Sequence, residues 1–578
     1  MNGLYLFVGA VVFFALSYCL YGKYLSRCFG IDPKRVCPSI SKQDGQDFSP
    51  APAAVLFGHH FASIAGSGPI VGPVIAAIFG WAPAALWILI GCVFVGSMHD
   101  FAALFLSVRN EGRSIAYVIE RELGYLGRQI FLLFCLASLM LIVAVFTIMV
   151  AQTFVSTPSV ATSSILFIFI APFFAVALRQ NMLSLAEASA VFVPLLFLCV
   201  WLGCVFPLDL TALLGSAEHA RTAARLGLLY YAFVASVLPV WILLQPRDYL
   251  NSYLLIGTML LGIAGVICYR PEFSMPAFVN PVALVPDSNL RLIPDLLPLL
   301  FVTIACGACS GFHALVASGT TSKQIASEKH IQPVGMGAMM VEGILAILAI
   351  ISVAYLKYDD FAGMFYSADF VPTLAFASGI ANFTAKLGLP YDFGVSFLCL
   401  SVSAFMLTSL DTAARLARFI WQELFLSRQG GADEGGQEVH QEGAPAGRKQ
   451  FWQMALSNRW VSTGIIIVLS GLLVFSDSVL RIWPVFGASN QLMAALTLMV
   501  LTLWLLRTGR KLWFGLLPAL FMTVISIWSL VILIGSRWEK EKLLAGIGCV
   551  LLVAAVLLLA LATHTVRKHF RARRCQRT

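Results

Sequence analysis

The chain has 578 residues, of which 59% are hydrophobic and 12% are charged, and its formal net charge is +9. A soluble globular domain carries about 25% charged residues, so this composition excludes an ordinary soluble protein. The positive charge gathers in alternate loops and in the C-terminal tail, as membrane topology requires, and therefore does not indicate a nucleic-acid partner.

Apolar runs long enough to cross a bilayer recur along the chain. Each covers about 17–25 residues, which as a helix crosses a hydrocarbon core of about 30 Å. Alternating strand patterns are absent, so we predict an all-α polytopic integral membrane protein with about fifteen transmembrane helices. The predicted spans are 3–22, 52–80, 84–108, 129–155, 163–180, 183–206, 226–244, 249–269, 295–318, 334–356, 391–414, 460–476, 490–506, 512–534 and 543–563.

Lys and Arg are concentrated on the membrane side that holds residues 23–51 and the C-terminal tail. By the positive-inside rule this side is cytoplasmic, which places the N-terminus outside a plasma (inner) membrane crossed many times. The hydrophobic stretch 361–389 is interrupted by Asp369, Pro372 and Lys386, so we expect it to be re-entrant or to lie on the outer surface. If it crosses the membrane instead, the topology downstream inverts.

Composition divides the chain into four parts. Residues 1–50 contain the first span and a cytoplasmic loop, 51–428 form the membrane core, and 460–578 hold the C-terminal helices and a basic tail. Between them, 429–459 includes a stretch rich in Gly, Glu and Gln that cannot bury a core. We expect this part to be a flexible cytoplasmic linker.

Glycine and proline break the helix predicted at 57–73. Gly66, Gly68 and Gly72 are interleaved with two prolines, which remove backbone donors, while glycine permits unwound backbone. Such backbone is tolerated at membrane depth only where it faces protein or a cavity. In many secondary transporters discontinuous helices bind substrate and ion near the midplane, amides facing anions and carbonyls facing cations. The alternative is a proline kink that packs closely against a neighbour.

A second Gly- and Ser-rich stretch, 305–319, lies in a span of opposite predicted orientation, as an inverted repeat demands. The span that begins at 245–248, after Pro239, has the same orientation, and the sequence does not choose between the two. Cys306 and Cys309 form a CxxC in the second stretch, where packing explains them better than redox or metal chemistry.

Histidines in or beside the apolar spans are the first candidates for a site. An ionisable group at bilayer depth costs ~2.5–3.5 kcal/mol on insertion scales, so such groups line cavities or pair with one another. Together with the small residues around the two breaks they form the predicted substrate site. This set is His59, His60, Ser63, Gly66, Ser67, Gly68, Ser310 and His313.

Carboxylates at depth suggest ion coupling. Asp100 follows His99 directly, and Glu342 and Asp411 lie in other predicted spans. A histidine beside a carboxylate titrates close to physiological pH, so we assign His99, Asp100, Glu342 and Asp411 to proton coupling. Sodium coupling, the alternative, would use unwound carbonyls and the serine hydroxyls near them. For His99 and Asp100 the other interpretation is an interfacial pair that anchors a helix end.

Two further polar groups stand at span ends. Arg247 and Asp248 begin a span from the cytoplasmic side, where we predict that they pair or act as a gate, with simple topogenic charge as the alternative. Gly-Ala-Ser-Asn-Gln at 487–491 precedes a span, and its amides are expected to cap a helix or to bond between helices.

The histidines also raise two alternatives to transport. A membrane-embedded metal-dependent enzyme would use them as ligands, yet adjacent histidines on a helix point about 100° apart, and no HExxH or spaced ligand set appears. We therefore predict no metal, no cofactor and no catalytic residue. A nutrient sensor that does not transport is weakened by the lack of an appended soluble signalling domain.

Several stretches together resemble the carbon starvation protein A family. They are FGHHFASIAGSGPIVGP at 57–73, MHDF at 98–101, LSVRNEGRS at 106–114, PRDYLNSYLLIG at 246–257, ACGACSGFHALVASGTTSKQ at 305–324 and GASNQLMAA at 487–495. The resemblance implies an inner-membrane transporter related to the amino acid, polyamine and organocation superfamily. It further implies uptake of peptides or pyruvate with protons, as a carbon source during starvation. Neither the choice between these cargoes nor the choice between proton and sodium follows from the sequence.

Overall fold

The computed structural model describes residues 2–44, 48–180, 182–239, 242–279, 296–367, 370–425, 456–476, 479–539 and 541–575. Within these ranges the regular structure is helical, with isolated bridges in place of strands, which confirms the all-α fold class. Most of the linker predicted at 429–459 and the interrupting Asp369 lie outside the described residues.

In the part of the chain that the structure describes, twelve helices are long and apolar enough to cross a membrane, and one bent pair adds a thirteenth span. These spans are built from α1 (Gly3–Phe29), the pair α3 (Ala53–Ile64) and α4 (Gly68–Ala76), α5 (Trp81–Gly91) with α6 (Ser97–Arg109), α7 (Ile115–Ser156), α8 (Pro158–Arg179), α9 (Leu185–Val205), α12 (Leu244–Tyr269), α16 (Ala338–Ala354) with the turns before it, α19 (Tyr391–Phe425), α21 (Arg459–Ser476), α22 (Val479–Thr508), α23 (Trp513–Arg537) and α24 (Lys542–Cys575). The remaining α-helices are α2 (Pro38–Ser41), α10 (Leu210–Leu214), α11 (Ala217–Val237), α13 (Leu296–Thr303), α14 (Ala305–Ala308), α15 (Phe312–Gly319), α17 (Tyr358–Phe365) and α18 (Pro372–Ala385).

Two of the predicted spans form helices outside these thirteen. The span predicted at 226–244 corresponds to α11, which carries the charged residues Glu218, Arg221 and Arg225 in its first half. The span predicted at 295–318 is divided into α13, α14 and α15, none of which is long enough to cross alone. Hydropathy locates both segments in the sequence. Charged residues make the first segment less apolar than a span, and breaks in the backbone divide the second.

The ambiguous stretch at 361–389 does not form one spanning helix. It contains the end of α17 and all of α18, and α18 has 14 residues, a length of about 21 Å against a hydrocarbon core of about 30 Å. α18 packs against α12, α16 and α19. The stretch therefore fits the re-entrant interpretation better than a full crossing.

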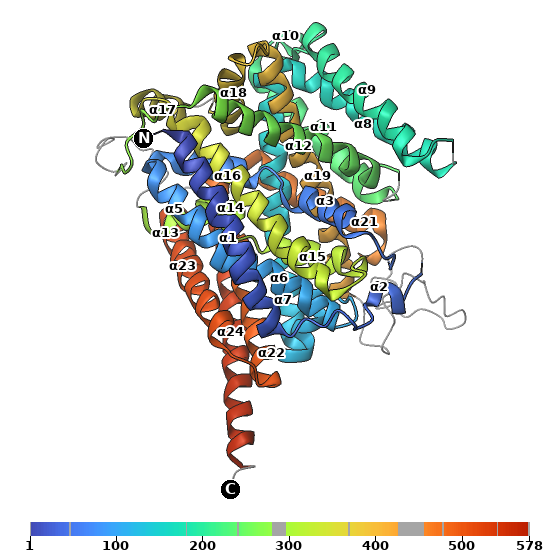
Figure 1. Ribbon diagram of the computed structural model, residues 1–578, viewed down its shortest axis with the longest axis vertical. Helices are drawn as coiled ribbons and strands as arrows, with labels where there is room; N and C mark the ends of the chain where they lie inside the picture. The colour runs from blue at the N-terminus through green and yellow to red at the C-terminus, as the bar shows by residue number, and fades with distance from the viewer. Residues whose placement is uncertain are drawn as a thin grey trace.

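The most buried helices occupy the centre of the bundle. In α22, 94% of the most apolar window is buried, compared with 28% in α1 at the periphery. Figure 1 shows α7 passing through the middle of the bundle, with α23 and α24 on one side and α8 and α9 on the other. The N-terminus lies on the same side as α17, whereas the C-terminus lies at the far end of α24.

Candidate functional site

The two glycine-rich stretches each break a helix, and the two broken helices run antiparallel. The first is α3–α4, bent by 45° at its break, and the second is α13–α14–α15. α3 packs against α15, whereas α4 packs against α13 and α14. This arrangement selects 305–319 as the partner of the first break, because residues 245–248 lie in the first turn of the continuous helix α12.

Glycine allows the two breaks to touch. A Cβ placed on Gly72 would lie 2.6 Å from the backbone oxygen of Thr303, and one on Gly68 would lie 2.4 Å from the Cβ of Cys306. Neither position therefore has room for a side chain. The broken segments are therefore held against each other by shape as well as by hydrogen bonds.

Each broken helix is followed by a helix that contains a π-helical segment. These segments are η2 (Cys92–Gly96), which leads into α6, and η6 (Gln332–Gly337), which leads into α16. π-helical turns are rare and occur often at functional sites. Each is followed within a few residues by a buried acid, Asp100 in α6 and Glu342 in α16.

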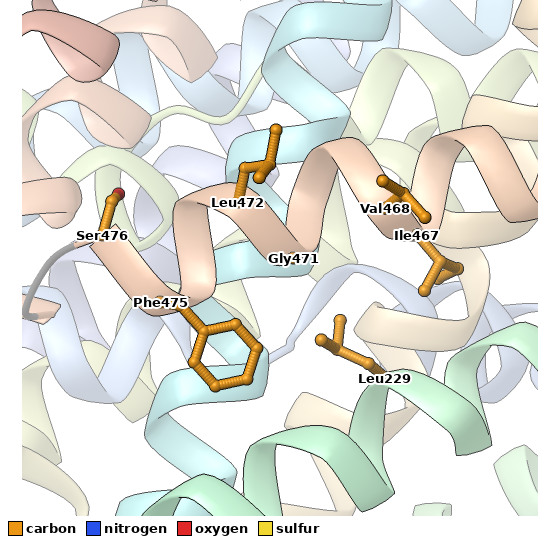
Figure 2. A pocket seen from close by; sticks show the side chains of 7 residues that line it. All are labelled: Leu229, Ile467, Val468, Gly471, Leu472, Phe475 and Ser476. Carbon is orange, nitrogen blue, oxygen red and sulfur yellow. The ribbon is translucent and has the colours of Figure 1, made fainter.

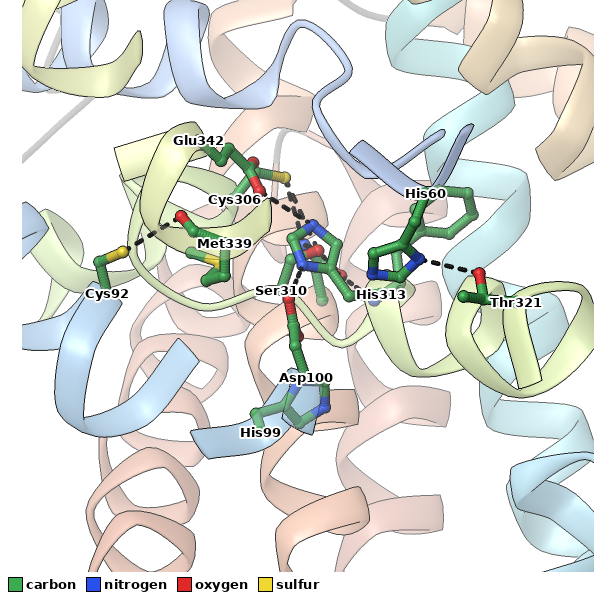
Figure 3. A network of polar contacts seen from close by, with 12 residues as sticks. His60, Cys92, His99, Asp100, Cys306, Ser310, His313, Thr321, Met339 and Glu342 are labelled. Carbon is green, nitrogen blue, oxygen red and sulfur yellow. Dashed lines mark hydrogen bonds and ion pairs between the residues drawn. The ribbon is translucent and has the colours of Figure 1, made fainter. Parts of the chain in front are cut away.

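Four buried titratable side chains form a chain where α6, α15 and α16 meet (Figure 3). His99 Nδ1 lies 2.8 Å from one carboxylate oxygen of Asp100, and His313 Nδ1 lies 2.7 Å from the other. His313 Nε2 is 3.5 Å from Oε2 of Glu342. All four side chains are fully buried, so a change of charge on one of them leaves its partners uncompensated. The arrangement suits the gain and loss of a proton by the group as a whole.

His60 of the first break lies beside His313 but bonds to a different partner (Figure 3). His60 is buried, and its Nδ1 is 2.9 Å from the hydroxyl of Thr321, in the turn after α15. Ser63 donates a hydrogen bond of 2.8 Å to the backbone oxygen of His59, one turn earlier in α3. His59, His60 and Ser63, all predicted substrate residues, therefore form hydrogen bonds within α3 and to the turn after α15. None of them lines the cavity that lies between the two breaks.

A small cavity of about 20 Å³ lies between the two breaks, which is room for about one water molecule. Of the predicted substrate residues, Gly66 and Gly68 line it, and Ser67 lies between them. An organic substrate is larger than this cavity and fits only after the two broken helices move apart. The structure therefore shows a conformation in which the cavity is closed. The lining residues are Ile64, Gly66, Gly68, Ile142, Phe146, Cys306, Phe312, Ser409, Phe486 and Asn490, none of which is ionisable except the thiol Cys306.

Asn490 of α22 fastens the second break. Its Oδ1 accepts a hydrogen bond of 2.9 Å from the backbone N–H of Phe312, and its Nδ2 donates one of 3.0 Å to Ser310 Oγ. Its backbone oxygen accepts from the N–H of Gly311 at 3.0 Å. Of the two roles predicted for the amides at 487–491, bonding between helices is thus confirmed. These residues lie inside α22 rather than before it, so they do not cap the helix that was predicted to begin at 490. Asn490 uses the first amides of α15. At the start of α4, Ile70 and Val71 donate to the Ser67 oxygen, so the N–H of Gly68 is the better candidate for a ligand.

The residues predicted to act as a gate form a second buried cluster. Arg247 Nη1 lies 2.5 Å from Asp411 Oδ2, and the Tyr231 hydroxyl donates to the same oxygen at 2.9 Å while accepting from Arg247. Asp248 is also buried, beside Arg247. Asp411 therefore pairs with Arg247 rather than with the histidines. Tyr231 was not predicted as part of a site, because a tyrosine in an apolar helix carries no local signal in the sequence.

A third polar cluster surrounds Glu328, which the sequence did not single out. Arg109 Nη2 donates to Oε2 of Glu328 at 2.9 Å, and Arg109 Nε forms an ion pair with Oε1 at 2.8 Å. The backbone N–H of Asp32 adds a bond of 2.8 Å, and Arg109 also donates to the oxygen of Gly30 at 2.8 Å. The cluster joins the ends of α1 and α6 to the turns before α16. Glu328 follows a polar stretch, so its burial was not predictable from its neighbours in the sequence.

Other features of the described residues do not form a substrate site. No group of three His, Cys, Asp or Glu side chains within the described ranges is placed to hold a metal ion. An apolar groove of about 500 Å³ lies between α11 and α21 on the surface of the bundle (Figure 2). Its lining, drawn in Figure 2, is apolar except for Ser476, so it matches a lipid chain better than a polar cargo.

Comparison with known proteins finds relatives over nearly the whole length of the chain. The sequence matches the family described as carbon starvation protein CstA over residues 2–375 and 367–529. A peptide transporter, CstA, from Campylobacter jejuni is 32% identical over 91% of this chain and 80% of its own length. The pyruvate/proton symporter BtsT of Escherichia coli is 30% identical over 92% of this chain and 81% of its own length.

Among solved structures, a manganese transporter from Eremococcus coleocola aligns with 92% of this chain and 99% of its own, at 10% identity and a TM-score of 0.49. The family assignment depends on the sequence matches alone. They cover nearly the whole chain and include both broken helices and the buried histidine–carboxylate chain. The chain belongs to the carbon starvation protein CstA family, and it is a secondary transporter rather than an enzyme.

Proposed function

We propose that the protein is a proton symporter that takes up a small organic acid of the pyruvate class as a carbon source. The observation that carries this proposal is the pairing of two neighbouring sites. One is a cavity whose lining holds no carboxylate, imidazole or basic group, and the other is the buried chain of His99, Asp100, His313 and Glu342. The name of the E. coli symporter supports the same cargo and ion.

The start of α4 is the proposed carboxylate site. The first turn of a helix carries a partial positive charge, which stabilises an anion. Among the first four residues of α4, Pro69 has no N–H, and Ile70 and Val71 donate to the Ser67 oxygen at 3.0 and 2.8 Å. The N–H of Gly68 is therefore the amide left for an anion. Gly66 and Gly68 line the cavity there, and the hydroxyl of Ser67 is buried without a hydrogen-bond partner in the described structure. Ser310 contributes less directly, because it is already bonded to Asn490.

A peptide is the second candidate cargo, since several relatives are named peptide transporters. The ammonium group of a peptide needs an acidic partner, and no acidic residue lines the cavity. Asp411 lies two residues after the lining residue Ser409 but is held by Arg247 and Tyr231. The lining thus favours a monoanion over a zwitterion.

His313 is proposed to be the centre of proton coupling. Its imidazole stands between two carboxylates, Asp100 at 2.7 Å and Glu342 at 3.5 Å, so a bound proton is shared by three groups. His313 lies on α15, which belongs to a broken helix, whereas Asp100 lies on α6. Movement of the break therefore alters the proton's surroundings.

In the proposed orientation the protein crosses the plasma membrane with its N-terminus outside the cell and its C-terminus in the cytoplasm. The basic residues Arg567, Lys568 and Arg571 at the end of α24 support this orientation by the positive-inside rule. This orientation is tested by fusing either terminus to a reporter enzyme that is active on only one side of the membrane. Activity of an N-terminal fusion in the cytoplasm would invert the topology.

Uptake into proteoliposomes tests the function. Labelled pyruvate and a labelled dipeptide are supplied with an imposed pH gradient to wild type, His313→Gln and Asp100→Asn, and to His219→Gln as a control at an exposed histidine. We expect the wild type and His219→Gln to accumulate pyruvate until the gradient is collapsed. The two site variants should lose accumulation while retaining part of their exchange of labelled for unlabelled pyruvate.

The outcomes separate the alternatives. Accumulation of the dipeptide alone would make peptides the cargo, and accumulation that follows sodium rather than pH would move the coupling away from His313. Binding without flux of either compound would favour a sensor. Equal accumulation by His313→Gln and wild type would remove the buried chain from the mechanism.

A further inference from the structure

The cluster around Arg247 has more hydrogen-bonding capacity than its protein partners use. Arg247 is fully buried, and only its Nη1 is bonded, to Asp411 and Tyr231. Its Nε and Nη2 have no hydrogen-bond partner in the described part of the chain, and neither do Oδ1 of Asp411 and Oδ1 of Asp248. A buried donor or acceptor left unpaired costs about 1–3 kcal/mol, and more when it is charged. So many unpaired atoms at one place indicate a site that receives a polar ligand or water.

The geometry of the unused atoms specifies the ligand. Nε and Nη2 of a guanidinium lie side by side and donate in parallel, which matches the two oxygens of a carboxylate. Tyr231, on α11, adds a hydroxyl on the Nη1 side. A cation is disfavoured, because the free donors belong to a positive charge.

The cluster lies on the reverse side of a helix that lines the central cavity. Ser409 of α19 lines the cavity, and Asp411 follows two residues later, about 200° further around the helix. α19 packs against both α11 and α12, which carry Tyr231 and Arg247. These helices are drawn close together in Figure 1. One helix therefore separates the cavity from the cluster.

We propose that Arg247 forms a second carboxylate-binding site, at which a small organic acid passing between the central cavity and the membrane face where α12 begins binds Nε and Nη2 of the guanidinium, beside Asp411, and weakens the ion pair at Nη1. This inference rests on the proposed transport of such an acid. It changes the predicted gate of Arg247 and Asp248 into a gate that the cargo itself opens.

Charge balance connects this second site to the proton. The charged groups facing Asp411 are Arg247 and Asp248 of α12 and Arg415 of its own helix, and Tyr231 faces it from α11. Two cations and two anions balance at present. An entering carboxylate adds one negative charge, which leaves the buried cluster unbalanced unless one of its carboxylates, such as Asp411, takes up a proton. The acid and a proton are therefore expected to arrive together, in agreement with the assignment of Asp411 to proton coupling.

Four variants test the site by uptake and exchange of labelled pyruvate in proteoliposomes. Arg247→Lys keeps the charge but loses the parallel donors, and Arg247→Gln combined with Asp411→Asn removes the ion pair without leaving a net charge. Tyr231→Phe removes the hydroxyl alone. Arg128→Gln combined with Glu423→Gln is the matched control, because that pair also connects to α19, at 2.5 Å, but lies outside the cluster.

We expect Arg247→Lys and the Arg247/Asp411 double variant to exchange pyruvate about 10- to 100-fold more slowly than wild type, as for loss of hydrogen bonds between charged groups. Equilibrium binding of labelled pyruvate to the purified variants should stay near the wild-type affinity, which shows that they fold and that the central cavity is intact. The control pair should exchange normally.

Pyruvate exchange at the wild-type rate in the Arg247/Asp411 double variant would overturn the inference. An ion pair that only closes a gate can be removed without slowing exchange, whereas a binding site cannot. Loss of pyruvate binding in every Arg247 variant, including Arg247→Lys, would also overturn it, since the residue would then support the fold or the central cavity. Failure of the wild type to transport any small organic acid would instead refute the proposed function.

Discussion

Replacement of Gly72 by alanine tests whether the two broken helices must touch. A Cβ at this position would meet the backbone oxygen of Thr303 at 2.6 Å and the Cα of Ile304 at 3.3 Å. Both atoms belong to the main chain of the second break and cannot turn aside as a side chain does. Gly58 provides the matched control, because it lies in the other half of the same broken helix and a Cβ there meets nothing within 4 Å.

The size of the effect follows from comparing the two variants. Both glycines lie in helices, so each alanine gains the same ~0.5–1 kcal/mol of helix propensity, and that contribution cancels in the comparison. What remains is the overpacking at Gly72, typically ~1–3 kcal/mol. The position before Pro73 adds to this cost, because a Cβ there crowds the proline ring. We expect Gly72→Ala to be less stable than Gly58→Ala by ~1–3 kcal/mol.

Thermal unfolding in detergent, together with pyruvate exchange in proteoliposomes, measures the effect. Gly72→Ala should unfold at a lower temperature than wild type and exchange pyruvate much more slowly, because the breaks must separate to fit the added methyl group. Gly58→Ala should match or exceed wild-type stability and should transport normally. Equal stability and equal exchange in the two variants would refute the close contact of the breaks.

Three further outcomes are expected from the same structure. Glu328→Gln leaves Arg109 without its charged partner and should lower the free energy of unfolding by ~3–5 kcal/mol, while unchanged thermal unfolding would contradict the role of this cluster. Asn490→Ala removes the side-chain bonds to Phe312 and Ser310 and should cost ~1–3 kcal/mol and raise the KM for pyruvate, and a normal KM with normal stability would count against it. A chelator such as EDTA should leave pyruvate uptake unchanged, and inhibition that zinc reverses would revive a metal site at the histidines.

The sequence by itself located thirteen of the predicted spans and both helix breaks, although it also predicted spans at 226–244 and 295–318 that the structure does not form as single apolar helices. Hydropathy over about 20 residues indicates a segment that lies in lipid. Gly66, Gly68 and Pro69 interrupt the helix at the positions where they occur. Both signals are local along the chain. For the same reason the sequence identified His313, Asp100 and Glu342 as ionisable groups that need partners at depth.

Only the tertiary structure decided which partners these groups have. His313 bonds to Asp100 across 213 residues, whereas Asp411 bonds to Arg247 and His60 to Thr321. Such pairings depend on which helices cross and at what height, and no local pattern encodes that. Tyr231, Glu328 and Asn490 escaped assignment to the site for the same reason, because their importance comes from side chains brought to them by distant helices.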